Sequence, residues 1–183
     1  MASRVVDVDK RYRKIVKAIG GLDDVSAVVG IRQEKGGERY HGEGPPGARH
    51  AVAGGLTLAE IATVLEFGAP SVGIPERPYL RDTFDLNAAR YEEILTLGIK
   101  EATKPANLEH FDAELRKVIE ITAIAAVGDV QEAIATPGAF APNAPLTIAI
   151  KGSSVPLIDT GRLRQSIDYE VVDGPAPREG KAR

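Results

Sequence analysis

Two long segments with helical periodicity constrain the fold of this 183-residue chain more strongly than any other feature. Apolar residues recur there every three or four positions, the spacing that lines one face of an α-helix. In the first segment these positions are Phe84, Ala88, Tyr91, Leu95, Ile99 and Ala102, and in the second they are Leu108, Phe111, Leu115, Val118, Thr122 and Ala125. Pro105 separates the two segments, because proline is tolerated in a first helical turn but not in a helix interior. We therefore predict two long amphipathic helices, the first beginning near Phe84.

Strand-like segments lie on either side of these helices in the sequence. Val25–Arg32 is rich in β-branched residues, and Ile167–Val172 alternates in character along its length. Leu146–Ile150 is ambiguous, because its alternation suits a strand while Pro145 and Gly152 at its borders suit a helical turn. Two strands far apart in the sequence, with two long helices between them, predict an α+β fold in which a small antiparallel sheet packs against the helices.

Two shorter helices are predicted upstream of the long ones. The segment Asp9–Gly20 has an apolar helical face and ends at a pair of glycines. Thr57 and Glu60 have the spacing of a capping box, so a helix should begin there and end at Gly68.

Composition along the chain predicts one domain with mobile attachments. Residues 1–24 form an N-terminal helical arm, and residues 25–173 form a single α+β domain. Within that domain, glycine and proline dominate residues 33–56, which predicts a long flexible loop that orders on a partner. The polar residues 174–183, also rich in proline and glycine, form a mobile C-terminal tail.

The overall composition is globular, with 43% hydrophobic and 27% charged residues, and it argues against several functions. The absence of cysteine removes disulfides, thiol catalysis and cysteine-bound zinc. A formal net charge of −3 does not favour nonspecific binding to nucleic acid, which usually needs a basic excess. No apolar run approaches the ~20 residues that span a bilayer, and no signal-like segment follows Met1. We expect a protein that is made in the cytoplasm and has no membrane partner.

The most enzyme-like motif is Ile158–Gly161, whose sequence IDTG has the pattern of the catalytic loop in retroviral-type aspartic proteases. Those enzymes pair two aspartates that share one proton. Here a helix-forming run with two arginines follows at once, and a nearby cation would lower the pKa that one aspartate must keep high. We favour a structural role, in which Asp159 or Thr160 is the N-cap of a short helix and Gly161 completes the turn.

No other pattern predicts a catalytic, cofactor-binding or metal-binding residue. His41, His50 and His110 lack the spacing of metal ligands, and there is no glycine-rich phosphate loop. A basic cluster lies on the polar face of the predicted N-terminal helix and consists of Lys10, Arg11, Arg13, Lys14 and Lys17. Exposure to solvent explains this cluster best. An aspartic protease and a DNA-binding accessory protein are kept as alternatives to a structural protein.

The segment Ile74–Arg81, with the sequence IPERPYLR, has residue types that favour a protein interface. Its two prolines, three positions apart, preorganise an extended backbone, which loses little entropy on docking. Arginine and tyrosine side chains are enriched in the cores of interfaces. We predict subunit or partner contacts at Arg77, Pro78, Tyr79, Leu80 and Arg81. The alternative is a connection between two helices that packs locally.

Three blocks in a fixed order resemble a known group of proteins. They are Leu65–Gly68 (LEFG), Ile74–Arg81 (IPERPYLR) and Lys151–Ile167, which contains PLIDTGRLRQSI. In this order they resemble the neck or tail-completion proteins of long-tailed bacteriophages and the related Mu-type virion morphogenesis proteins. The resemblance covers roughly Val25 to Val172, and Tyr79 stands where that family more often has phenylalanine.

The resemblance implies a structural virion protein at the head–tail junction, with an α+β fold and no enzymatic activity or cofactor. It implies a homo-oligomeric ring, usually hexameric, that contacts other connector, neck and tail proteins. Genomic DNA would pass through its channel without specific binding, and assembly would take place in the bacterial host cytoplasm. A tail-tube terminator or minor tail protein is the alternative within this class. Arg162 and Arg164 would project from their helix towards a neighbouring subunit or towards the sheet.

Overall fold

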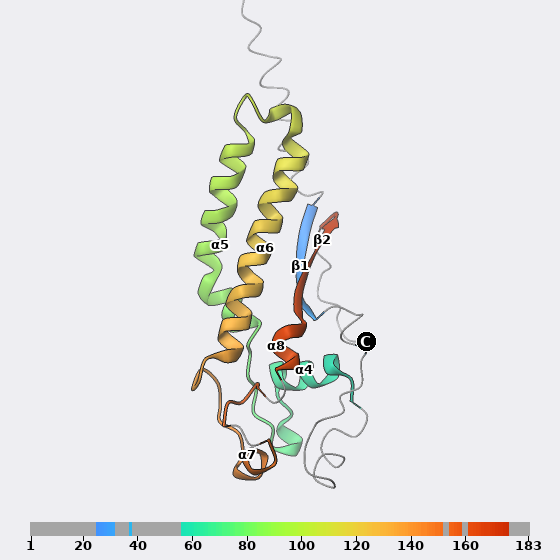
Figure 1. The fold of residues 1–183 in the computed structure, drawn as a ribbon, viewed down its shortest axis with the longest axis vertical. Helices are drawn as coiled ribbons and strands as arrows, with labels where there is room; N and C mark the ends of the chain where they lie inside the picture. The colour runs from blue at the N-terminus through green and yellow to red at the C-terminus, as the bar shows by residue number, and fades with distance from the viewer. Residues whose placement is uncertain (1–24, 32–36, 38–55, 152–153, 159–160, 176–183) are drawn as a thin grey trace, which may run out of the picture. The chain divides into compact units, whose positions relative to one another are not determined.

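The computed structural model describes residues 25–31, 37, 56–151, 154–158 and 161–175 (Figure 1). In chain order the elements are β1 (Val25–Ile31), α4 (Leu58–Phe67), the 3-10 turn η2 (Pro70–Val72), α5 (Arg81–Ala102), the 3-10 turn η3 (Leu108–His110), α6 (Phe111–Ala135), α7 (Pro145–Lys151), α8 (Arg162–Ser166) and β2 (Ile167–Asp173). The predicted N-terminal helix, nearly all of the loop over 33–56 and most of the C-terminal tail lie outside the described residues.

The two long helices predicted from periodicity are confirmed as α5 and α6. Helix α5 begins at Arg81 rather than near Phe84. The backbone amides of Asp82 and Phe84 already donate to the carbonyls of Pro78 and Leu80, which closes a helical turn before the first apolar position of the pattern. Periodicity marks the buried face of a helix, so it misses a polar first turn.

The two predicted strands pair into a two-stranded antiparallel sheet, and the α+β fold class is confirmed. Strands β1 and β2 end within one residue of the predicted limits. Beyond the end of β2, the hydroxyl of Ser26 donates to the carbonyl oxygen of Gly174 over 2.8 Å. The ambiguous segment around Leu146–Ile150 is helical and belongs to α7.

The capping box predicted for α4 is present. The hydroxyl of Thr57 accepts from the backbone amide of Glu60 at 3.3 Å, and the Glu60 carboxylate accepts from the backbone amide of Thr57 at 2.7 Å. The helix ends at Gly68, whose φ of +70° is a conformation that favours glycine.

The single domain expected over 25–173 corresponds to two compact units. The hairpin unit consists of Ala89–Ile124 with the described residues of Met1–Val28 and Glu170–Arg183. The motif unit consists of the described residues of Val29–Ala88 and Ala125–Tyr169. Helices α5 and α6 and both strands contribute residues to each unit.

The hairpin unit is built on an antiparallel pair of helical segments (Figure 1). Its apolar cluster consists of Ala102, Phe111 and Leu115 with Ile99 and Ile119 packed against them. Gly98 permits the close approach of the two segments, because a Cβ atom at this position would lie 2.4 Å from Cγ1 of Val118. Outside this cluster, an ion pair joins Arg116 to Asp173.

The motif unit has a larger core that joins segments far apart in the sequence. Its buried residues are Ala62, Tyr79, Val130, Ile134, Leu157, Leu163 and Ile167. The half-buried side chains of Val29, Leu65, Leu80 and Phe84 pack against this cluster, among others. The core therefore brings together α4, the segment after it, the C-terminal part of α6, and the chain from Leu157 into β2.

Candidate functional site

The segment between α4 and α5 folds into a compact loop with regular backbone pairing. Ala69 and Ile74 form an antiparallel bridge, in which each backbone amide donates to the other residue's carbonyl oxygen, at 2.8 and 3.1 Å. Gly68 precedes this bridge, and a Cβ atom there would lie only 2.7 Å from the backbone nitrogen of Glu76. The LEFG and IPERPYLR blocks are thus packed backbone against backbone, with space at Gly68 for glycine alone.

A buried carboxylate joins the two blocks. The side chain of Glu66 accepts hydrogen bonds from the backbone amides of Leu80 at 2.9 Å and Arg81 at 3.1 Å. These amides lie at the start of α5, where the helix dipole also favours a negative charge. The residue itself is only 4% exposed. Glu66 therefore caps α5 from a different helix.

Arg81 closes the same cluster from its solvent side. Its Nε atom donates to the Glu66 carboxylate at 3.1 Å, and its Nη2 atom donates to the Glu66 carbonyl oxygen at 2.9 Å and to the Glu76 carboxylate at 3.4 Å. The guanidinium also lies 4.9 Å from the centre of the Phe67 ring, a cation–π distance. The hydrogen bond with Glu66, followed by other contacts with Glu66 and Glu76, raises the pKa of Arg81.

Arg77 is buried on the other side of the loop and binds only neutral acceptors. Its Nε atom donates to the carbonyl oxygen of Ala141 at 2.8 Å, and its Nη2 atom donates to the carbonyl oxygen of Pro142 at 3.2 Å and to Oδ1 of Asn143 at 3.4 Å. The backbone amide of Arg77 also donates to the carbonyl oxygen of Leu65 at 2.8 Å. Arg77 thereby ties the proline-rich segment to the chain that follows α6, and its burial lowers its pKa.

Tyr79 lies in the centre of the motif-unit core, with 1% of its surface exposed. Its carbonyl oxygen accepts a hydrogen bond from the hydroxyl of Thr83 at 2.7 Å in the first turn of α5. Burial first, and the charge of Glu66 second, raise the pKa of the Tyr79 hydroxyl well above its ordinary value.

These positions correct the sequence prediction for one of the interface residues. Tyr79 cannot anchor a partner, because its whole side chain is packed inside its own subunit. Arg77 is also buried, and its hydrogen bonds hold a loop of the same chain. Pro78 and Leu80 are half-buried, and of the five predicted residues only Arg81 is exposed.

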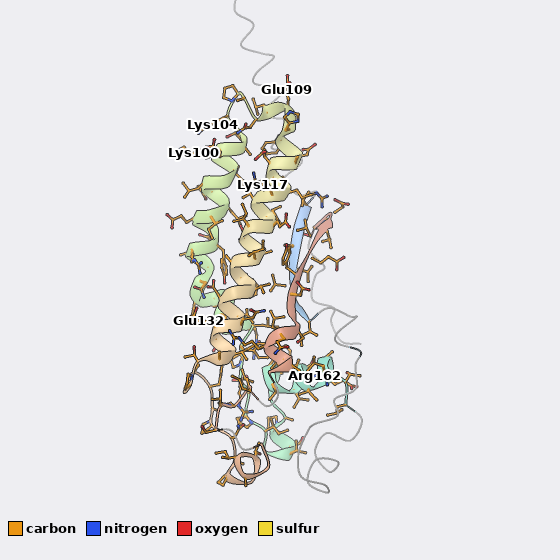
Figure 2. All side chains as sticks on the ribbon, viewed as in Figure 1. Lys100, Lys104, Glu109, Lys117, Glu132 and Arg162 are labelled. Atoms are coloured by element: carbon orange, nitrogen blue, oxygen red, sulfur yellow. The ribbon has the colours of Figure 1, made fainter. Side chains whose placement is uncertain are left out.

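The contacts predicted for the arginines of α8 stay a prediction. Arg162 and Arg164 are exposed, and Arg162 lies on the surface of the motif unit (Figure 2). The residue at the N-cap position is Gly161, which has no side chain for capping and lies in the left-handed conformation at φ +77°. The prediction of Asp159 or Thr160 as N-cap is therefore wrong in position, because the glycine itself makes the turn. The side chains of Asp159 and Thr160 lie outside the described residues.

Charges on the hairpin unit are mixed in sign. Lys100, Lys104 and Lys117 project from α5 and α6, and Glu109 lies at the turn between these helices (Figure 2). Lys104 forms an ion pair with Glu101 at 2.5 Å. This alternation differs from the basic stripe that marks a nucleic-acid surface.

Metal-binding groups and membrane-spanning helices are absent from the part of the chain that the structure describes. There, no group of three or more His, Asp or Glu side chains is arranged to hold a metal ion. Nor does any helix within these residues have the length and apolar character needed to cross a membrane.

Two functional features of the loop were missed by the sequence analysis. Glu66 falls four residues after Ala62 and eight after Leu58, and all three are buried. A carboxylate on the apolar face of a helix was the signal that could have revealed a buried partner. Asn143 gave no such signal, because nothing in a proline-rich stretch indicates which side chain faces inward.

Comparisons with known proteins identified no relative of this chain. No family model, no curated protein and no solved structure matches it.

Proposed function

We propose that this chain is a structural protein of a tailed bacteriophage, located in the neck or tail-completion ring at the head–tail junction. The observation that carries the proposal is the meeting of the three resemblance blocks in one core. Leu65, Tyr79 and Leu163 represent the LEFG, IPERPYLR and PLIDTGRLRQSI blocks, and all three pack in the same apolar cluster.

Short sequence matches that arise by chance have no reason to pack together. In this chain the first two blocks are joined by the Glu66 carboxylate and the amides of Leu80 and Arg81. The third block contributes Leu157, Leu163 and Ile167 to the core around Tyr79. The three blocks therefore act as one folding unit, which supports reading them as a single inherited pattern.

The use of the polar residues also supports a structural role over an enzymatic one. Glu66, Arg77 and Arg81, the charged groups with the most specific geometry, are each engaged in holding the loop and the helix start. In the proposed role these interactions make a rigid loop of defined shape. An aspartic protease would instead depend on Asp159, which lies outside the described residues.

Exposed apolar side chains provide surface for the subunit contacts that a ring requires. In the motif unit Phe67, Val72 and Leu86 are 57%, 70% and 84% exposed. In the hairpin unit the corresponding residues are Leu97, Ile121 and Ile124. Apolar groups on a protein surface are individually common, but several on one chain suit a protein that assembles.

The proposal is tested by an early stop codon in the gene for this chain, in the genome of the phage that encodes it. Negative-stain microscopy of the lysate should show filled heads and separate tails, and a plasmid copy of the intact gene should restore joined particles. Tails of normal length would indicate a joining role, whereas overlong tails would indicate a tail-tube terminator. Normal infectious particles without complementation would contradict the proposal.

A further inference from the structure

The guanidinium of Arg77 is a buried cation without a carboxylate partner among the described residues. It is 5% exposed, and its three hydrogen bonds go to two backbone carbonyl oxygens and one side-chain amide oxygen. Arg81, only four residues later, has two carboxylate partners, Glu66 and Glu76. Neutral acceptors satisfy hydrogen bonds, but they do not balance a positive charge that has been removed from water.

One edge of the Arg77 guanidinium remains available. An arginine side chain has five N–H donors, and the three hydrogen bonds of Arg77 use Nε and Nη2 only. Its Nη1 atom has no acceptor among the described residues. Within these residues no buried side-chain nitrogen or oxygen lacks a hydrogen-bond partner, so Nη1 must reach the molecular surface.

The available edge is also held in a fixed orientation. The guanidinium is planar, and the contacts with Ala141, Pro142 and Asn143 lock that plane from its opposite edge. Asn143 is itself held, because its Nδ2 atom donates to the carbonyl oxygen of Val155 at 3.4 Å. A preorganised donor loses little entropy when an acceptor arrives. The lowered pKa of Arg77 reflects the same uncompensated desolvation.

We propose that Nη1 of Arg77 is a binding site for a carboxylate, supplied by an aspartate or glutamate side chain of a second copy of this chain. Charge complementarity favours that source, since the chain has 26 acidic residues against 23 lysines and arginines. The same excess disfavours the phosphate groups of DNA as the anion. The choice of a second copy rests on the proposed ring, whereas the carboxylate site itself does not.

The site is tested first on the dilute wild-type protein by side-chain NMR of its arginines. Chloride is replaced stepwise by acetate at constant ionic strength, and inorganic phosphate is titrated in a parallel series. The Arg77 Nη resonances should shift and saturate with acetate, while those of Arg81, already paired, and of exposed Arg164 should drift linearly. A linear response at Arg77 would overturn the proposal. Saturation with phosphate alone would overturn its carboxylate character and indicate a nucleic-acid contact.

The source of the carboxylate is tested by self-association, measured by sedimentation at increasing protein concentration. Acetate in place of chloride should weaken the association of the wild-type protein. Arg77→Lys, which keeps the charge but loses the forked geometry, should raise the dissociation constant about tenfold or more. Arg90→Lys, at an exposed position outside the predicted interface residues, is the matched control and should leave it unchanged.

The outcomes distinguish a failure of the carboxylate site at Arg77 from a failure of the proposed function. Acetate binding at Arg77 without any effect of acetate on association, or without association at all, would overturn the second copy as partner and leave the carboxylate site standing. If Arg77→Lys loses its folded circular dichroism spectrum, the acetate competition on the wild-type protein still tests whether a carboxylate mediates self-association. Normal particles from the stop-codon phage would contradict the proposed head–tail role. They would not affect the conclusion drawn from the acetate titration of Arg77 by NMR.

Discussion

The hairpin unit and the motif unit are stabilised by different kinds of interaction. In the hairpin unit, Phe111 and Leu115 repeat at helical spacing and pack on Ala102 just across a short turn. In the motif unit, the apolar core is joined by charged groups that act over long stretches of sequence. Arg77 reaches Ala141, which is 64 positions away, and Glu66 reaches Leu80 and Arg81.

This difference predicts which substitutions should destabilise each unit. Apolar contacts between neighbouring helices are numerous and individually replaceable, so the hairpin should tolerate most conservative changes. The motif unit depends on a few polar groups whose partners are buried with them, and removal of one partner leaves the other without a hydrogen bond.

Tyr79→Ala should have the largest effect, because it empties the centre of the motif-unit core. Truncation of a buried aromatic residue costs about 3–5 kcal/mol, and the free energy of unfolding in urea should fall by that amount. Tyr79→Phe is the control, since it retains the ring, and it should cost less than about 1.5 kcal/mol. If the alanine variant unfolds at the same urea concentration as the wild type, Tyr79 does not hold the core.

Glu66→Gln should come next, at about 1.5–3 kcal/mol, the range for hydrogen bonds to a charged group. The substituted amide keeps one acceptor oxygen but presents N–H donors to the amides of Leu80 and Arg81. Glu76→Gln removes an exposed carboxylate from the same arginine and should change stability by less than about 0.5 kcal/mol. Equal losses in the two variants would mean that burial of Glu66 is unimportant. Urea unfolding, monitored by circular dichroism, measures both.

The raised pKa of Tyr79 predicts instability at alkaline pH. Because the folded state retains the hydroxyl proton more tightly than the unfolded state, the stabilisation is complete below the ordinary tyrosine pKa of about 10. It is lost as the pH rises further, with a slope of about 1.4 kcal/mol per pH unit for one proton. Urea midpoints measured across alkaline pH should show this slope in the wild type. A slope that persists unchanged in Tyr79→Phe would assign it to other groups.

Gly98→Ala tests the close approach of the helices in the hairpin unit. The new methyl group would meet Val118, and such overpacking costs about 1–3 kcal/mol, partly offset by about 1 kcal/mol of better helix propensity. Val118→Ala in the same chain should relieve the clash, so a double-mutant cycle should show coupling. The matched control is Gly128→Ala, where a Cβ atom meets nothing within 4 Å and stability should rise slightly. Additive effects of the first two changes would contradict the predicted contact.

Substitutions of exposed apolar residues should have the smallest effect on stability. Leu86→Ser in the motif unit and Ile121→Ser in the hairpin unit should each stay within about 0.5 kcal/mol of the wild type. The same variants report on assembly when they are supplied from a plasmid to the stop-codon phage. A loss above about 2 kcal/mol in either would show that the side chain is buried in the folded monomer.

Prediction from the sequence succeeded where the deciding interactions are local. The periodicities of α5 and α6, the capping box at Thr57 and the β-branched segments of both strands each depend on residues within a few positions of one another. The role of Tyr79 was predicted wrongly for the opposite reason. Its residue type suits an interface and a core equally, and only the packing of distant segments decides between the two.

Local sequence patterns predicted most of the described helices and strands and the order in which they occur. The tertiary structure decided which charged groups face inward, because burial depends on contacts between residues as far apart as Tyr79 and Leu163. It also decided what those groups do there. Glu66 caps a helix to which it does not belong, and Arg77 keeps one edge of its guanidinium at the surface while the rest is enclosed.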